Sequence, residues 1–573
     1  MKYKLYLTAC LLVLGLSCAH AIPAKKGVKR TIKLADGTSV EAELKGDEFA
    51  SYWQADDGKC YVQDIDSRTF KITDKAQVVN RGLAKRQKAN DERIKRFAKR
   101  GPKREITGAF SHFTGTKKGL IILVNFKDVK FGRTHTRTMF DNIANKKGFT
   151  NSLGFKGSVK DYFLAQSNGQ FELDFDVVGP YTLSQNMAYY GAHTKDGDVD
   201  AKAGHMVLEA CQMADKDVNY KDYDWDGDGE VDQVFVIYAG FGEADGGSED
   251  TIWPHESMLS ASTVGKRYET KDGVNVNTYA CGNENTYDML GRSRINGIGT
   301  ICHEFSHCLG YPDLYDTNYG GNFGMGSFDL MCSGSYNGES FCPPNYSAYE
   351  KWIAGWITPI VLDKPASVKG MQAQDVKYGQ AFVVYNDNNK NEYYLIENRQ
   401  QNVGIWDKQL PASGMMITHV DYDKNIWEWN NVNTIVNYSG DYAYLSNDHQ
   451  RLTIFHADNE EGSSADSQAG DLYPFNGNNS LTDTSSPAAT IYQGGTTMGK
   501  PITNITQNED GSIDFDFMGG SNDNIITGIH FIENDEMSSF GQGVYSLDGR
   551  YMGTSVNSLD KGIYIVNGKK IVK

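Results

Sequence analysis

The stretch from Ile301 to Asp316, ICHEFSHCLGYPDLYD, carries the strongest structural signal in this chain of 573 residues. It contains His-Glu-x-x-His, and on a helix His303 and His307 would project from one face, one turn apart. Two imidazoles in this arrangement can bind one zinc ion. Glu304 lies beside them, where it cannot easily bind the same ion but can act as a general base towards water. The pattern therefore predicts a catalytic zinc site.

The residues after this helix predict a third ligand. Gly310 can end the helix in a left-handed conformation, and Pro312 blocks its continuation. The chain then turns back and brings Asp313 towards the histidines, which leaves a fourth position for water, as a catalytic zinc requires. A later carboxylate, Glu339 or Glu350, is the alternative third ligand. For the motif as a whole, the alternative is an ordinary buried helix with two core histidines.

A second segment, DLMCSGSYNG at residues 329–338, belongs to the same prediction. Met331 is expected to lie in a turn that forms an apolar floor beneath the metal, and it can equally be a plain core residue. Tyr336 is a candidate contact for a transition-state oxyanion, although its position does not follow from the sequence.

The loop DWDGDGEVD, residues 224–232, predicts a structural calcium site. Its acidic residues stand at alternate positions, with Gly229 in the sixth place of a calcium loop. The expected ligands are Asp224, Asp226, Asp228 and Asp232 through carboxylates and Glu230 through its carbonyl. Phe235 occupies the twelfth position, where a bidentate Glu normally stands, so the loop is not a complete EF-hand. A solvated acidic turn without a cation is the alternative.

The N-terminus predicts export. Two lysines precede an apolar run at residues 5–16, and Ala19-His20-Ala21 supplies small residues for cleavage, so residues 1–21 are expected to be a signal peptide. A lipoprotein signal ending at Cys18 is the alternative. Export permits disulfides, and the six cysteines beyond residue 104 allow up to three. They are Cys211, Cys281, Cys302, Cys308, Cys332 and Cys342.

Charge is distributed unevenly along the chain. The formal net charge of -16 argues against nucleic-acid binding. Residues 22–104 carry 21 Lys and Arg against 12 Asp and Glu, whereas residues 105–573 carry a net -27. We therefore expect residues 22–104 to be a pro-segment ending in a basic processing linker, with a solvated connector as the alternative. Cys60 could hold the enzyme latent as a fourth zinc ligand, or be a structural cysteine.

Apolar patterns predict an α+β fold. A buried strand is expected at 119–127, a helix after Ser158 and a strand from Phe171, which together indicate a mixed sheet beside the active-site helix. The expected domains are the catalytic domain at 105–356, a β-rich domain at 357–519 and a small β-sandwich-like domain at 520–573.

These motifs resemble the immune inhibitor A family of secreted metallopeptidases, of the metzincin type, over residues 110–518. HEFSHCLGYPDLYD and DLMCSGSYNG carry the resemblance, together with segments such as SVKDYFLAQSNGQFEL and GDLYPF. It implies zinc endopeptidase activity, calcium-stabilised loops and an N-terminal pro-segment. It also implies zinc ligation by His303, His307 and Asp313, with Glu304 as catalytic residue and a methionine turn at Met331. The tail, with VYSLDGRY followed by GIYIVNGKKIVK, is similar to C-terminal sorting domains of type IX secretion, which implies an export machinery as a partner. A plain β-sandwich cap is the alternative.

The expected function is that of a secreted zinc endopeptidase, made as a zymogen and acting on extracellular proteins or peptides. A monomer at the cell surface or in the medium is expected. The alternative is a calcium-dependent surface adhesin or glycan-binding protein on a peptidase-like scaffold. The complete set of two histidines, Glu304 and Asp313 favours the enzyme, since a binding scaffold has no use for the base.

Overall fold

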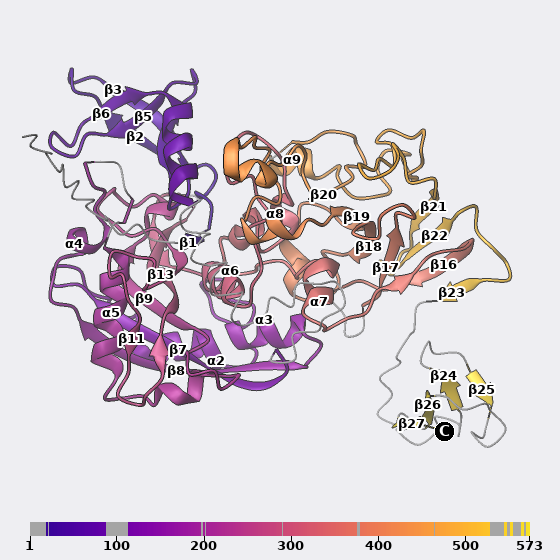
Figure 1. Ribbon diagram of the computed structural model, residues 1–573, viewed down its shortest axis with the longest axis horizontal. Helices are drawn as coiled ribbons and strands as arrows, with labels where there is room; N and C mark the ends of the chain where they lie inside the picture. Colours follow the sequence, from indigo (N-terminus) through magenta and orange to yellow (C-terminus); the bar gives the residue numbers. More distant parts are fainter. Residues whose placement is uncertain are drawn as a thin grey trace, which may run out of the picture. The chain divides into compact units, whose positions relative to one another are not determined.

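The computed structural model divides the chain into two compact units, one ending at Gly528 and the other beginning at Ile529 (Figure 1). It describes residues 19–20, 22–86, 113–195, 199–200, 202–288, 290–374, 379–462, 464–527, 544–546, 551–553, 563–566 and 569–572. Most of the expected signal peptide and the linker at 87–112 lie outside these ranges. Within them, no helix is long and apolar enough to cross a membrane.

A seven-stranded sheet forms the centre of the first unit. Its strands, in spatial order, are β1 (Ala19–His20), β10 (His255–Met258), β13 (Thr278–Tyr287), β9 (Val234–Phe241), β7 (Gly115–Asn125) and β8 (Phe171–Thr182), with β14 (Ser293–Ile295) beside β13. The four strands from β13 to β8 are parallel, while β1, β10 and β14 pair antiparallel. The mixed sheet expected for the catalytic segment is therefore present.

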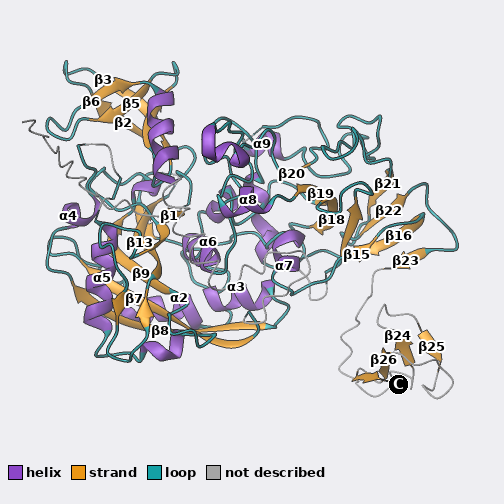
Figure 2. Cartoon of the chain, viewed as in Figure 1, coloured by secondary structure: helices purple, strands orange, loops and turns teal. Residues whose placement is uncertain are grey.

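Helices cover both faces of this sheet (Figure 2). Along β7, Ile121 and Leu123 enter one hydrophobic cluster, and Leu120 and Ile122 enter another on the opposite face. This alternation explains the uninterrupted apolar run of the strand. The first cluster contains α2 (Arg137–Asn145), α3 (Val159–Gln166) and α6 (Gly299–Cys308), and the second contains α4 (Met187–Gly191) and α5 (Ala203–Ala214).

The β-rich region contains two facing sheets. One is ordered β15 (Ile360–Val361), β17 (Ala381–Tyr385), β18 (Glu392–Arg399), β19 (Gly414–Asp421) and β20 (Leu452–Ile454). The other is ordered β21 (Ile502–Gln507), β22 (Ile513–Phe517), β16 (Ala366–Met371) and β23 (Ile525–Thr527). Phe382, Tyr394 and Phe515 lie in one hydrophobic cluster that joins the two sheets.

The opposite face of the β15–β20 sheet joins the core of the catalytic segment. Leu395 and Met416 belong to the same buried cluster as Phe305 of the active-site helix. The expected boundary at residue 356 therefore crosses a continuous core, and β23, beyond the expected boundary at 519, pairs with β16. Residues predicted as two domains form one packed body.

The leader forms a separate small sheet, as its alternating segments predict. Its five antiparallel strands follow sequence order: β2 (Lys29–Lys33), β3 (Ser39–Gly46), β4 (Ser51–Ala55), β5 (Cys60–Gln63) and β6 (Phe70–Thr73). Helical residues 75–86 follow.

Shorter elements complete the first unit. They are α7 (Ala348–Ile353), α8 (Lys424–Glu428), α9 (Ala465–Gln468), the hairpin β11 (Tyr268–Glu269) and β12 (Asn275–Val276), and the 3-10 turns η1 (Tyr220–Tyr223), η2 (Glu243–Asp245), η3 (Gly326–Phe328), η4 (Ser333–Tyr336), η5 (Trp406–Gln409) and η6 (Gly440–Leu445). The second unit is an antiparallel sheet of β25 (Tyr551–Gly553), β24 (Val544–Ser546), β26 (Ile563–Val566) and β27 (Lys569–Val572). Its sorting role stays a prediction.

Candidate metal centre

Helix α6 presents two histidines to one point. It spans Gly299–Cys308, so His303 and His307 are separated by one turn, as the motif predicts. Their Nε2 atoms are 3.2 Å apart, and both side chains are buried. The α6 face that carries Phe305 packs into the large core cluster between the two sheets.

The chain after α6 returns Asp313 to these histidines. Gly310 adopts a left-handed φ of 95° and its N–H donates to the His307 carbonyl, which ends the helix. Asp313 Oδ1 then lies 3.3 Å from Nε2 of both His303 and His307. The three side chains form a group able to hold a metal ion.

The alternative third ligands are engaged elsewhere. Glu339 forms an ion pair with Arg294. Glu350 accepts from the backbone N–H and hydroxyl of Ser347 in the capping box of α7. Neither belongs to the metal-ligating group found among the described residues. Asp313 is the carboxylate that the fold brings to the histidines.

Backbone carbonyls determine which ring nitrogen of each imidazole is a hydrogen-bond donor. Nδ1 of His303 donates to the Leu330 carbonyl, and Nδ1 of His307 to the Tyr311 carbonyl, each at 2.8 Å. A neutral imidazole with its proton on Nδ1 has a lone pair on Nε2. Burial also lowers the pKa of His303, which favours this neutral form. Each Nε2 atom can therefore bind a metal ion, and the hydrogen bond at Nδ1 fixes the orientation of the ring.

The donor set fits zinc. Two nitrogen lone pairs and a carboxylate oxygen meet within 3.3 Å in a buried place, and they repel one another unless a cation lies between them. In a tetrahedron with ligand bonds of about 2.0–2.1 Å, the ligand atoms are about 3.3–3.4 Å apart. The observed spacing is the one that such a site needs.

The segment that contains Met331 supports this site through its backbone. The Met331 carbonyl accepts from Leu314 N at 2.8 Å, and the Leu330 carbonyl holds His303. Met331 N donates to Asp329 at 2.7 Å, and the Met331 side chain is fully buried in the core. Its two expected descriptions, a turn beside the site and a core residue, are compatible.

Glu304 is buried beside the ligands but is not one of them. Its Oε1 accepts from the backbone N–H of Ile22 at 2.8 Å. Among the described residues, its Oε2 has no hydrogen-bond partner, and burial raises the pKa of Glu304 well above its usual value. The carboxyl group is therefore available for proton transfer and is covered by the leader.

The last described residues of the expected signal peptide lie along the edge of the central sheet, and Ile22 of the leader contacts Glu304. Ala19 and His20 pair antiparallel with β10, and the next residues continue past Glu304. Trp253 Nε1 donates to the Ile22 carbonyl at 2.9 Å, and the Tyr336 hydroxyl donates to the Pro23 carbonyl at 2.7 Å. The sequence did not predict these contacts, because nothing in an export signal indicates where the following residues dock.

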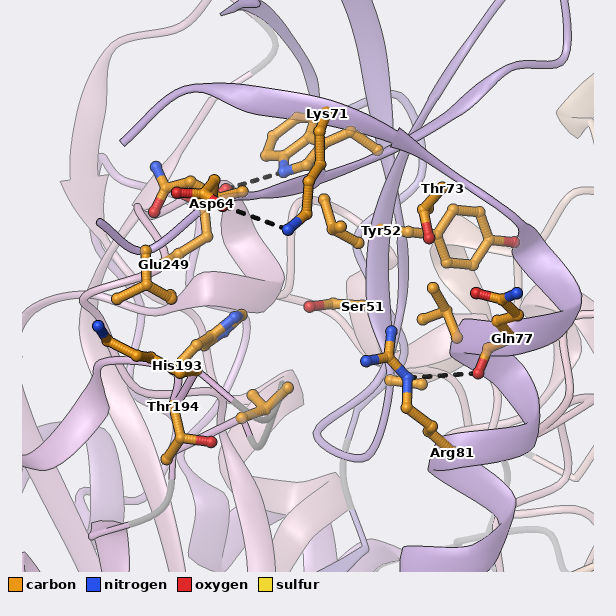
Figure 3. Close-up of a pocket in the computed structure, with 18 of the residues that line it drawn as sticks. Ser51, Tyr52, Asp64, Lys71, Thr73, Gln77, Arg81, His193, Thr194 and Glu249 are labelled. Carbon is orange, nitrogen blue, oxygen red and sulfur yellow. Dashed lines mark hydrogen bonds and ion pairs between the residues drawn. The ribbon is translucent and has the colours of Figure 1, made fainter. Parts of the chain in front are cut away.

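A cavity of about 770 Å³ lies between the leader sheet and the body (Figure 3). Its walls include Tyr52, Lys71 and Arg81 of the leader and His193 and Glu249 of the body. No metal-ligating residue named above lines it. It is a crevice of the leader–body contact and separate from the metal centre.

The acidic loop brings together three of its four expected carboxylate ligands, and Glu230 is expected to bind through its carbonyl. Carboxylate oxygens of Asp224, Asp226 and Asp232 lie within 4.8 Å of one another. Asp228 lies outside this group, and Glu230 lies 3.2 Å from Arg267 in an ion pair. The loop therefore has a smaller carboxylate cluster than its sequence predicts.

The cysteines do not extend the metal centre. None of the cysteines of the described residues is in a disulfide: Cys60, Cys211, Cys281, Cys302, Cys308, Cys332 and Cys342. The Cys60 thiol donates to the Gly58 carbonyl on its own leader turn, and Cys60 is absent from the metal-ligating group. Nothing here supports a role for Cys60 in latency.

Asn430, from the β-rich region, touches the third ligand. Its Nδ2 donates to Asp313 Oδ2 at 2.7 Å. No sequence pattern points to this residue, which lies in the asparagine-rich run WNNVNT at 429–434, far from the motif. Only the packing of the β-rich region against α6 brings it to the site.

Residues 114–356 match the model of the immune inhibitor A peptidase M6 catalytic domain. The chain is also similar to the pre-pro-metalloprotease PrtV of Vibrio cholerae, with 29% identity over 260 residues, 39% of this chain and 28% of PrtV. It is 27% identical to immune inhibitor A of Bacillus thuringiensis over 304 residues, 44% of this chain and 42% of that protein. The chain spans less than half the length of these relatives. The matched region resembles a metallopeptidase catalytic domain and contains every metal-centre residue predicted from the motif.

Proposed function

We propose that this protein is a secreted zinc-dependent endopeptidase that hydrolyses peptide bonds of extracellular proteins. The observation that carries the proposal is the convergence of His303, His307 and Asp313, with Glu304 beside them. The match of residues 114–356 to a peptidase catalytic domain supports the same chemistry.

Bound zinc would polarise the substrate carbonyl and lower the pKa of a water molecule. Glu304 accepts the proton of the attacking water and passes it to the leaving nitrogen. Its contact with Ile22 supports this role, because a nitrogen donor lies 2.8 Å from Oε1. The carbonyls of Leu330 and Tyr311 keep both histidines oriented throughout.

A calcium-dependent adhesin on the same scaffold would need neither the three converging ligands nor a general base. Calcium-dependent binding does not use a buried carboxyl group next to three converging donor atoms. A buried acid without a function only lowers the stability of the fold. The placement of Glu304, with one oxygen on a peptide N–H, favours the enzyme.

Glu304→Gln tests this proposal in protein freed of its leader. The variant keeps the shape of the side chain and all three ligands, so it is expected to bind one zinc per chain while casein cleavage falls about 10²–10⁴-fold. Zinc content and cleavage rate are measured together, and a zinc chelator abolishes the activity of the wild type. Glu509→Gln, at an exposed acid remote from the motif, serves as the matched control. Cleavage by Glu304→Gln at the wild-type rate would contradict the mechanism.

We also propose that the leader keeps the enzyme latent as a zymogen. Residues 22–25 occupy the space before Glu304, and Lys25 N donates to the Ala244 carbonyl at 2.9 Å. Ion pairs add to this contact, with Arg30 2.7 Å from Glu249 and Arg68 2.7 Å from Asp250. These ion pairs hold the basic leader against acidic residues of the body.

Cleavage of the linker should therefore activate the protein. The chain beginning at Ile22 is expected to cleave casein weakly, and brief trypsin treatment, which cuts after basic residues of the linker, should raise the rate at least tenfold. A trypsin inhibitor is added before the assay, and Glu304→Gln treated identically reports any residual trypsin. Equal activity before and after verified loss of the leader would argue against latency.

Calcium is proposed as a structural ion at Asp224, Asp226 and Asp232. Their carboxylates would bind it just before β9, a central strand of the sheet. The clustering of these carboxylates supports this assignment, because their charges repel one another and a bound cation would reduce that repulsion.

Calcium should then raise the unfolding temperature of the zinc-loaded protein. At about 100 times its dissociation constant the ion stabilises by about 2.7 kcal/mol. Asp226→Asn removes one charge and keeps the side-chain shape, so most of this gain should disappear, whereas Glu509→Gln should retain it. Thermal unfolding with calcium or with a calcium-selective chelator measures the effect. An equal calcium response in Asp226→Asn and wild type would rule out this site.

A further inference from the structure

The third metal ligand is held at two points by a residue outside the matched peptidase region. Asn430 Oδ1 accepts from the backbone N–H of Asp313 at 2.7 Å, and Asn430 Nδ2 donates to Asp313 Oδ2 at 2.7 Å. Both side chains are fully buried. One amide therefore fixes the main chain and the carboxylate of the same ligand.

This contact decides which oxygen faces the histidines. The carboxylate group of an Asp can rotate about its Cβ–Cγ bond, and such a rotation would move the coordinating oxygen away from the histidines. With Oδ2 bound by Asn430, Oδ1 is the oxygen that lies 3.3 Å from His303 and His307. The amide is suited to the task because it offers a donor to the carboxylate and an acceptor to the N–H.

Asn430 is itself held rigidly. It follows α8, where its φ of 57° is left-handed and its N–H donates to the Trp427 carbonyl at 3.1 Å. Asn is among the few residues other than glycine that adopt this conformation readily. Trp427 belongs to the core cluster that contains α6, so the same packing anchors both sides of the contact.

Neighbouring residues tie the rest of the ligand loop to this segment. Asn433 Nδ2 donates to the Leu314 carbonyl at 2.8 Å, and Thr317 N donates to the Thr434 hydroxyl at 2.8 Å. These contacts hold the loop backbone but do not reach the Asp313 carboxylate. They provide a comparison with Asn430 at the same interface.

We propose that Asn430 is a positioning residue for the metal centre, so that the functional peptidase unit extends from the matched region to at least residue 434. This inference rests on the proposed function, since it assigns a ligand-orienting role to Asn430 within that same zinc site. The alternative is that Asn430 only joins two parts of the fold, as Thr434 does.

Two substitutions in the full chain separate these roles. Asn430→Asp keeps the size and the left-handed preference but replaces the donor facing Asp313 Oδ2 with a repelling oxygen. Asn430→Gly keeps the backbone conformation and removes the side chain. Thr434→Val, the matched control, removes the Thr317 contacts at the same interface and leaves Asp313 untouched.

The readouts are the zinc dissociation constant, measured by competition with a chelator, and the visible absorption of the cobalt-substituted protein. Loss of a residue that orients a ligand is expected to weaken zinc binding about 10–100-fold in both Asn430 variants. Their cobalt spectra should also differ from the wild type. Thr434→Val should bind zinc within about threefold of the wild type and give its cobalt spectrum.

The outcomes are distinguishable. Wild-type zinc affinity and cobalt spectra in both Asn430 variants would overturn the inference, and so would equal losses in Thr434→Val. Loss of folded structure in both Asn430 variants, by circular dichroism, would also count against it, because Asn430 would then act on the fold. If the wild type bound no zinc, or if His307→Ala bound zinc equally well, the proposed function itself would fail.

Discussion

Two imidazole nitrogens and a carboxylate oxygen that meet in a buried place are the constraint on which this structure depends. His303, His307 and Asp313 cannot be held 3.2–3.3 Å apart at low cost unless a cation joins them. Neighbouring backbone and side-chain groups hold the three side chains in this arrangement. Carbonyl groups take the second nitrogen of each imidazole, Gly310 turns the chain, and Asn430 takes the spare carboxylate oxygen.

The larger architecture follows from the need to hold these side chains. Helix α6 is packed between the central sheet and the β15–β20 sheet, and one hydrophobic cluster runs through all three. The β-rich region is therefore part of the support of the site. Ile22 of the leader contacts Glu304, and ion pairs hold the basic leader against acidic residues of the body.

Local sequence predicted the parts of the site that are local in the chain. The two histidines, the glycine turn and Asp313 lie within eleven residues, so a helix followed by a left-handed turn brings them together, and buried strands such as β7 follow from apolar runs. Asn430 lies 117 residues beyond Asp313, and its role depends on tertiary packing that no short pattern encodes. The expected domain boundary at 356 coincides with the end of the matched peptidase region, while the hydrophobic core continues across it, which composition alone does not predict.

X-ray absorption at the zinc edge of the zinc-loaded full chain tests the central claim most directly. The account predicts a nearest shell of nitrogen and oxygen alone, at about 2.0–2.1 Å, with imidazole scattering from two histidines. Free thiols lie on and near α6, at Cys302, Cys308 and Cys332, so a sulfur ligand is the natural competitor. A sulfur shell at about 2.3 Å would contradict a centre made by His303, His307 and Asp313.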